Sequence, residues 1–199
     1  MDFVDQLIAR RSAPALLLGT PVPSEADLAR VFRAAMAAPD HGGLKPWRFI
    51  IVRGDARAKL GQVMADAQKK KDPTIDADGL EREKNKPQRS AMIIAVAVAL
   101  DAENKKIPAQ EQIVSGACAA HSMMLAFQAL GYGSVMLTGP GAYSADVKAS
   151  LGLRASDAIV AYVYVGTPKS ELPAARPRPD YSQFVREWTG PESVAKAAE

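Results

Sequence analysis

The nine residues from Met92 to Leu100 constrain the fold of this chain more than any other segment. They read Met-Ile-Ile-Ala-Val-Ala-Val-Ala-Leu and include no polar residue. A strand with one exposed face alternates polar and apolar residues, so this run predicts a strand buried on both faces. It is too short to cross a bilayer. The run therefore predicts the central strand of a sheet that is covered on both sides.

A helix that is apolar almost all round is predicted over residues 110–130. Such a helix must be buried on several sides. Gly116, Ala119 and Ala120 within it are small enough to let another helix approach closely. Gly131 follows as a candidate C-terminal stop.

The size and composition are those of an ordinary globular domain. The chain has 199 residues, of which 48% are hydrophobic and 24% charged, and its formal net charge is +3. Its only basic run, Lys69-Lys70-Lys71, is flanked by acidic residues, so no nucleic-acid partner is expected. A single cysteine and two histidines give neither an internal disulfide nor a zinc-ligand spacing. With no apolar signal segment near the N-terminus, we expect a cytoplasmic protein without metal or membrane association.

The remaining pattern predicts a single domain over residues 1–199. Asp2 and Ser24 are candidate N-caps of the first two helices. Strands are expected over 47–52, 135–138 and 158–165, and helices over 55–70 and 145–151. Three segments are less typical of a core. Residues 71–90 are expected to form an exposed helix or lid. Residues 169–190 are expected to form an extended, proline-rich C-terminal arm, and residues 190–199 to form a frayed end.

Arg10, Arg11 and Ser12 follow the apolar pattern of the first helix. Two guanidinium groups and a hydroxyl make a compact anion trap, because arginine presents a planar fork of donors that fits a phosphate at two points. The same residues could instead complement the dipole at a helix C-terminus. The triplet alone leaves both interpretations open.

Three further motifs follow in order: residues 38–49 (Ala-Pro-Asp-His-Gly-Gly-Leu-Lys-Pro-Trp-Arg-Phe), 130–139 (Leu-Gly-Tyr-Gly-Ser to Thr-Gly) and 164–168 (Tyr-Val-Gly-Thr-Pro). With the arginine triplet, this series resembles the FMN-dependent nitroreductase family. The Ala-Pro-Asp-His form resembles a subgroup of small bacterial NAD(P)H nitroreductases. Asp40 stands where that family usually has serine, and Lys45 where it usually has glutamine.

The resemblance implies an α+β fold of three layers, with a central mixed β-sheet flanked by helices, in an intertwined homodimer with two FMN sites at the interface. It implies a ping-pong reaction in which NADH or NADPH reduces the flavin at N5 and an electron-poor small molecule, such as a nitroaromatic or quinone, is then reduced. The flavin would carry the chemistry, so no catalytic side chain is expected. No Gly-x-Gly-x-x-Gly follows a predicted strand, so the nicotinamide coenzyme would be a transient electron donor.

The resemblance also implies the residues that bind the cofactor. Arg10, Arg11 and Ser12 would hold the FMN phosphate. The segment Met136-Leu137-Thr138-Gly139 would line the flavin at the end of a strand. Arg178, like Arg176, could reach the phosphate or could lie on a solvent-facing arm, and the sequence leaves this open.

Two polar residues of the 38–49 loop complete the predicted site. His41 would hydrogen-bond the flavin pyrimidine edge or the ribityl chain. Lys45 would place a cation near the N1/O2 edge and stabilise the anionic reduced ring, although a solvated loop lysine is an equal alternative. Many relatives carry a basic residue where this chain has Pro14. Without that cation, stabilising the reduced flavin would depend more on Lys45 or on a residue of a partner chain.

Two alternatives remain at this level. The same fold could serve flavin fragmentation or reductive dehalogenation, both known among relatives. The second alternative is not an enzyme: the chain could be a protein that binds or senses flavin without turnover.

Overall fold

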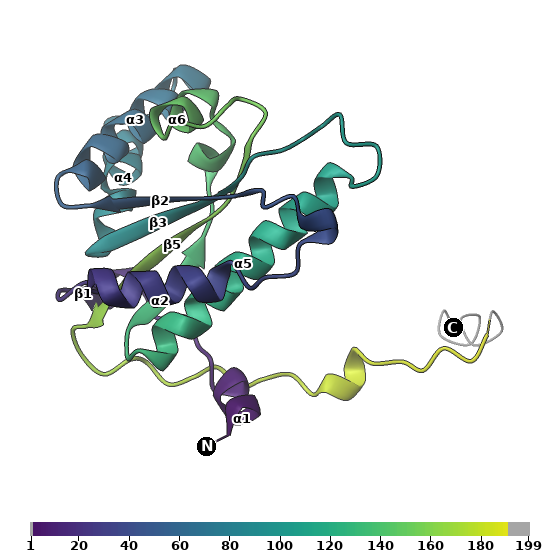
Figure 1. Cartoon of the computed structure of the whole chain (residues 1–199). Coiled ribbons are helices and arrows are strands. Elements are labelled where there is room, and N and C mark those ends of the chain that lie inside the picture. The colour runs from purple at the N-terminus through teal and green to yellow at the C-terminus, as the bar shows by residue number, and fades with distance from the viewer. Residues whose placement is uncertain (1, 191–199) are drawn as a thin grey trace.

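The computed structural model describes residues 2–190 and shows a five-stranded sheet between two layers of helices (Figure 1). The strands run in the order β1-β5-β3-β2, and β4 also pairs with β5. Their bounds are β1 Leu18–Gly19, β2 Trp47–Arg53, β3 Met92–Val98, β4 Gly133–Leu137 and β5 Ala158–Pro168. The helices are α1 Phe3–Ile8, α2 Glu25–Ala35, α3 Ala56–Lys71, α4 Ala77–Asn85, α5 Ala109–Ala129 and α6 Ala145–Ser150. Short 3-10 helices are η1 Ala15–Leu17, η2 His41–Gly43, η3 Lys86–Arg89, η4 Pro140–Tyr143 and η5 Tyr181–Gln183.

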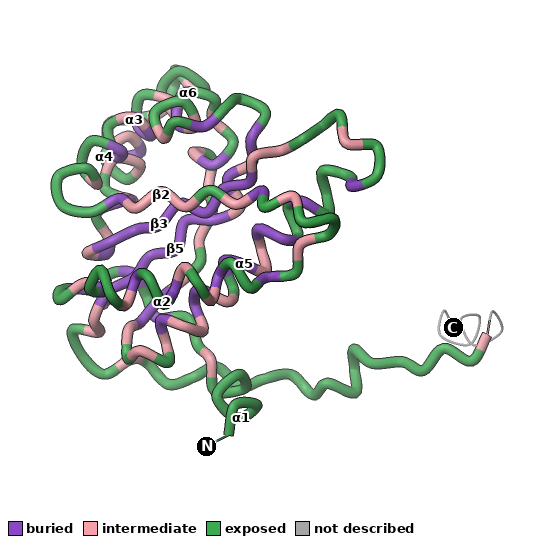
Figure 2. The backbone as a smooth tube through the Cα atoms, viewed as in Figure 1, coloured by how far each residue is buried: buried purple, intermediate pink, exposed green. Residues whose placement is uncertain are grey.

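β3 is the central strand that the apolar run predicts. Ile94 faces Ile51 of β2 on one side and Val163 of β5 on the other, and every residue of β3 is buried (Figure 2). Successive side chains of a strand point to opposite faces. Ile93 therefore joins the core beneath α3 and α6, while Ile94 joins the core beneath α2 and α5. Each face of the strand needs its own helical cover, which explains the three layers.

The α+β class with helices on both faces of the sheet is confirmed. Each strand pairing that the structure describes is antiparallel, and the parallel pairing that a mixed sheet also requires is not among them. The predicted N-caps are confirmed: the Asp2 carboxylate accepts from the Asp5 amide at 2.8 Å, and Ser24 Oγ accepts from the Asp27 amide at 3.1 Å. β1 has only two residues, too few for a pattern to predict it.

Of the small residues of α5, Ala119 and Ala120 lie in the core that α5 shares with α2, whereas Gly116 serves a different contact from the predicted one. A Cβ at Gly116 would overlap the side chains of Val98 and Val160. Gly116 therefore lets α5 approach the sheet rather than another helix of the same chain. The opposite face of α5 stays partly exposed, with Val114 54% accessible.

Residues 71–90 form α4 and η3, and α4 packs against α3 on the outer face of the sheet. A role as a lid stays a prediction. Residues 169–190 leave β5 as an extended and almost wholly exposed segment that contains η5 (Figures 1 and 2). The predicted frayed end falls almost entirely outside the described residues. Within residues 2–190, the longest apolar helices fall short of what a membrane crossing requires.

Candidate functional site

The Arg-Arg-Ser segment lies between the C-terminal end of α5 and the edge strand β4. The Ala13 amide donates to the Ser134 carbonyl of β4 at 2.9 Å, and Ala13 is 1% exposed. The Arg11 amide lies 3.4 Å from Oε1 of Gln128 near the end of α5. The bond of the buried Ala13 and the exposed contact to Gln128 therefore hold the triplet in place, while Arg11 and Ser12 stay exposed.

The triplet forms one wall of a cavity of about 680 Å³, which is large enough for a cofactor. Three segments far apart in the sequence meet there: residues 10–14, the β4 residues Val135 and Leu137, and the arm from Pro173 to Arg178. Arg10, Arg11, Arg176 and Arg178 all line it. Four guanidinium groups around one apolar strand make a cavity that favours a ligand with an anionic end and an apolar body.

Arg10 carries the clearest sign of a missing partner. Its Nη1 atom is buried, and no acceptor lies within hydrogen-bond distance among the described residues. A buried charged donor without an acceptor costs free energy, so such groups are rare unless a ligand completes them. The dipole interpretation does not account for this atom, because Arg10 lines the cavity. A phosphate in the cavity would supply the acceptor that this guanidinium lacks.

Two other arginines of the cavity already make protein contacts. Arg11 Nη1 donates to the Pro173 carbonyl at 2.9 Å, and Arg178 Nη2 donates to the Arg10 carbonyl. Arg178 Nη2 also lies 3.5 Å from the Ile8 carbonyl. These bonds join the arm to the N-terminal segment in both directions. Arg178 therefore points back to the body of the protein and not outward from a solvent-facing arm.

His41 and Lys45 lie at the other end of α5. His41 Nδ1 is 2.5 Å from Oε2 of Glu111, in the first turn of α5. Lys45 has a φ of 51°, an uncommon conformation for a residue with a Cβ, and its amide donates to the Asp40 carboxylate at 2.7 Å. Asp40, which departs from the usual serine, thus holds the turn that presents Lys45.

The loop is fixed to α5 by a hydrogen-bond chain. Trp47 Nε1 donates to Ser115 Oγ at 3.0 Å, and Ser115 Oγ donates to the Pro39 carbonyl at 2.7 Å. A second cavity of about 440 Å³ lies here, with His41, Glu111, Val114 and Cys118 in its lining. Trp47 thus serves the loop and the core rather than an open stacking surface.

The structure separates the predicted site residues into two groups. α5 has 21 residues and is about 30 Å long at 1.5 Å per residue. The Arg10–Ser12 segment, which lines the arginine cavity, lies at the C-terminal end of α5, and the His41–Lys45 loop lies at its N-terminal end. The two ends of α5 can be followed in Figure 1. One small ligand cannot touch both groups within one chain.

The predicted segment 136–139 is only partly in the arginine cavity. Leu137 lines it, but Met136 points to the α5 side of β4 and is 44% exposed. Thr138 is exposed beyond the end of the strand, and Gly139 has an extended backbone with a φ of 173°. The alternation of a strand explains why neighbours along β4 face opposite ways.

Sequence reasoning missed Lys86. A Cβ at Gly139 would lie 3.9 Å from Lys86 Nζ, which makes Lys86 a cation at the end of β4. It forms a half-buried ion pair with Glu83. The only signal in the sequence is a lysine within the polar segment 71–90, where it resembles any surface lysine.

Two tyrosines of β5 lie on the α3 side of the sheet. Tyr162, opposite Leu137 of β4, has a buried hydroxyl without a partner among the described residues. Burial raises the pKa of Tyr162, and burial also raises that of Tyr164. Both side chains are therefore neutral at physiological pH. Within residues 2–190, no group of three or more acidic, histidine or cysteine side chains could hold a metal ion.

Fold and site together define a class: an α+β protein with a basic cavity between its N-terminal segment, its edge strand and its C-terminal arm. The chain belongs to the nitroreductase family, whose family model matches residues 8–167. It is 36% identical to the Escherichia coli protein named "Putative NAD(P)H nitroreductase YdjA", over 93% of this chain and 98% of that protein. It is 33% identical to a Haemophilus influenzae protein of the same designation, over 84% of this chain and 89% of the relative.

Solved structures share the fold. A nitroreductase-like family protein from Bacillus cereus superimposes with a TM-score of 0.79 at 19% identity, covering 96% of this chain and 97% of the other. A mutant of the FMN and NADPH-dependent nitroreductase NfnB from Sphigopyxis sp. strain HMH gives 0.73 at 20% identity, covering 96% and 100%.

Proposed function

We propose that this chain is an FMN-dependent oxidoreductase that takes electrons from NADH or NADPH and passes them to nitroaromatic or quinone-like acceptors. The observation that carries the proposal is the buried Nη1 atom of Arg10, which has no acceptor among the described residues and lies in a basic cavity beside an apolar strand. A phosphate-bearing flavin has the matching chemistry, an anionic tail and an apolar ring system. The relatives' names and the FMN and NADPH dependence printed for NfnB support the same assignment.

The phosphate would be held by Arg10, Arg11 and Ser12, with Arg176 as a further cation on the arm. Arg178 would contribute mainly by fixing the arm through its bonds to backbone carbonyls. Leu137 would contact the ring from β4, and Thr138 and Gly139 would border it where the strand ends. FMN, when bound, supplies hydride acceptance and donation at N5. The side chains of this chain would bind, orient and tune it, and none is required as a proton donor.

We further propose that the active form is a homodimer with two shared sites. Within one chain, the His41–Lys45 loop and the arginine cavity lie at opposite ends of α5. A two-fold axis across α5 would bring the loop of one copy to the arginine cavity of the other. The exposed face of α5, including Val114 at 54% and the accessible His121, is suited to that contact.

The C-terminal arm supports the same arrangement. Tyr181, Phe184 and Trp188 are each more than 70% exposed, and soluble monomers seldom leave such large apolar side chains uncovered along one segment. An arm that lies over a second copy would bury them. A cytoplasmic location remains part of this proposal, on the sequence grounds given above.

The absorbance spectrum of the purified protein tests the cofactor first. Flavin bands at about 370 and 450 nm are expected. Anaerobic addition of NADH or NADPH should then bleach the 450 nm band, and a nitroaromatic should restore it. Bleaching without reoxidation by nitroaromatics or quinones would favour a different reaction of the same fold, such as dehalogenation or flavin fragmentation. No bleaching would favour a flavin-binding protein without turnover.

A further inference from the structure

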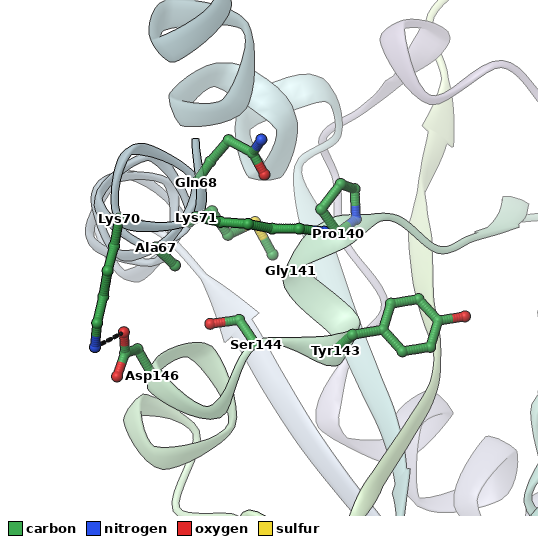
Figure 3. Close-up of a pocket in the computed structure, with 10 residues that line it drawn as sticks. Ala67, Gln68, Lys70, Lys71, Pro140, Gly141, Tyr143, Ser144 and Asp146 are labelled. Carbon is green, nitrogen blue, oxygen red and sulfur yellow. Dashed lines mark hydrogen bonds and ion pairs between the residues drawn. The ribbon is translucent and has the colours of Figure 1, made fainter. Parts of the chain in front are cut away.

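A separate cavity of about 270 Å³ lies between α3 and η4, on the outer face of the sheet (Figure 3). It shares no lining residue with the arginine cavity. At about 30 Å³ per water in the liquid, its volume suits a single-ring molecule and is too small for a flavin. The proposed function leaves this cavity without a role.

The charge in this cavity is set by two neighbouring lysines at the end of α3. Lys70 Nζ is 3.0 Å from the Asp146 carboxylate, so that pair is neutral. The Lys71 side chain makes no ion pair or hydrogen bond with any residue in the described part of the chain. Its side chain reaches from α3 across the cavity toward Pro140 and Gly141 (Figure 3). The cavity therefore presents one uncompensated positive charge.

The apolar part of the cavity lies on the same face of α3 as Lys71 and on η4, which faces that helix across the cavity. Met64 is only 5% exposed, and a Cβ at Gly141 would lie 3.4 Å from its side chain. η4 thus packs closely on the methionine, and Ala67 extends the same apolar surface along α3. A sulfur-containing side chain is a favourable neighbour for an aromatic ring. Ser144 adds a hydroxyl at the rim, on the side where Asp146 lies (Figure 3).

We propose that this cavity binds a small monoanion with an apolar body, with a single-ring aromatic carboxylate as the best fit. The ring would lie against Met64 and Ala67, and the carboxylate would pair with Lys71. A dianion is disfavoured because Asp146 cancels the charge of Lys70. η4 directly follows Thr138 and Gly139, so an occupant lies next to the chain segment that borders the proposed flavin site without entering it.

Calorimetric titration of the full-length, cofactor-loaded protein tests the proposal with sodium benzoate, its neutral analogue benzamide, and inorganic phosphate. Benzoate should bind saturably and about two- to fivefold more tightly than benzamide, since one charge contact in a partly open site is worth about that factor. Lys71→Met should weaken benzoate binding about two- to fivefold and leave benzamide unchanged, and Lys71→Arg should retain most of the affinity. Lys59→Met, an exposed lysine of the same helix outside the cavity, is the matched control.

Two measurements fix the location. Ala67→Phe should fill the cavity and abolish binding of both ring compounds, while flavin content stays as in the parent protein. Backbone NMR signals of Gly141 and Ser144 should shift with benzoate. The proposal is overturned if benzoate shows no saturable binding up to about 10 mM, if binding is insensitive to Lys71 and Ala67, or if phosphate binds as tightly as benzoate. Because binding is measured directly, the result does not depend on the redox activity proposed above.

Discussion

Arg11 donates from Nη1 to the carbonyl oxygen of Pro173 at 2.9 Å, and this bond joins residues 162 positions apart. Arg178 returns the contact by donating to the Arg10 carbonyl. The arm and the Arg-Arg-Ser segment are thus fastened together around one cavity. The arginine cavity therefore lies where the N-terminal segment meets the arm, and both segments line it.

Removing Arg10 should weaken FMN binding more than any other single change in the cavity. A charge-assisted contact of this kind contributes about 1.5–3 kcal/mol, so Arg10→Ala should raise the dissociation constant for FMN roughly 10- to 150-fold. Riboflavin, which lacks the phosphate, should lose little affinity. Fluorescence titration measures both, and Arg30→Ala on the exposed face of α2 is the control. If Arg10→Ala loses as much affinity for riboflavin as for FMN, Arg10 does not bind the phosphate.

Removing the hydrogen bond between Arg11 and the Pro173 carbonyl should make the C-terminal arm more mobile. Arg11→Ala removes a solvent-exposed charged hydrogen bond, so chymotrypsin should cleave after Tyr181 or Phe184 several-fold faster than in the parent protein. FMN affinity should fall by less than in Arg10→Ala. Time courses of limited proteolysis, with and without FMN, give the rates. An arm that is cut at the same rate in both proteins would show that this bond does not hold it.

The exposed face of α5 should be required for assembly. Val114→Asp places a carboxylate in the proposed two-fold contact, so the protein should sediment as a monomer at micromolar concentration and lose FMN. Ala58→Asp on the outer face of α3 adds the same charge at an exposed position away from that contact and should remain a dimer. A stable monomer of the parent protein that retains FMN would contradict the shared site.

Lys45 should tune the flavin potential from the partner chain. A cation near N1 stabilises the anionic reduced ring, so Lys45→Met should lower the two-electron midpoint potential by roughly 20–45 mV, which corresponds to about 1–2 kcal/mol. Lys86→Met is the informative comparison, because Lys86 lies at the end of β4 of the same chain. Spectroelectrochemical titration separates them. If the midpoint potential shifts in Lys86→Met but not in Lys45→Met, the residue that tunes the flavin is Lys86 and not Lys45.

The pair of Arg154 and Asp157 should make stability depend on pH. Burial alone would raise the pKa of Asp157, but the Arg154 hydrogen bonds and charge outweigh it and hold the pKa below its usual range. A lowered folded-state pKa contributes stability that is present above the unfolded-state value of about 3.9 and is lost as pH falls through the folded-state value. Arg154→Met should therefore lower the free energy of unfolding at pH 7. Urea unfolding at pH 7 and in the acid range checks this: the difference between variant and parent should shrink below about pH 4. If the difference in unfolding free energy between variant and parent does not change with pH, the loss of stability comes from packing and not from the ion pair.

The sequence by itself determined the layered core. The run 92–98 lacks polar alternation, and this local pattern is enough to require cover on both faces of β3. The caps at Asp2 and Ser24 are equally local, because each side chain bonds an amide three residues away. The ordered motifs identified the family for the same reason, since they can be read without knowing which segments meet in space.

Only the tertiary structure decided how the site is built. The cavity needs the chain to bring residues 10–14, β4 and the arm together, and closing loops of that length leaves no periodic trace in the sequence. The sequence indicated Arg10 as a binding residue, but it could not show that one guanidinium nitrogen, Nη1, is buried without an acceptor among the described residues. The sequence predicted that His41 and Arg10 bind the same flavin, whereas the length of α5 keeps them apart within a chain. Lys86 and Lys71 look like surface lysines until the folded chain shows what lies beside them, because surroundings and not residue type set the role of a charge.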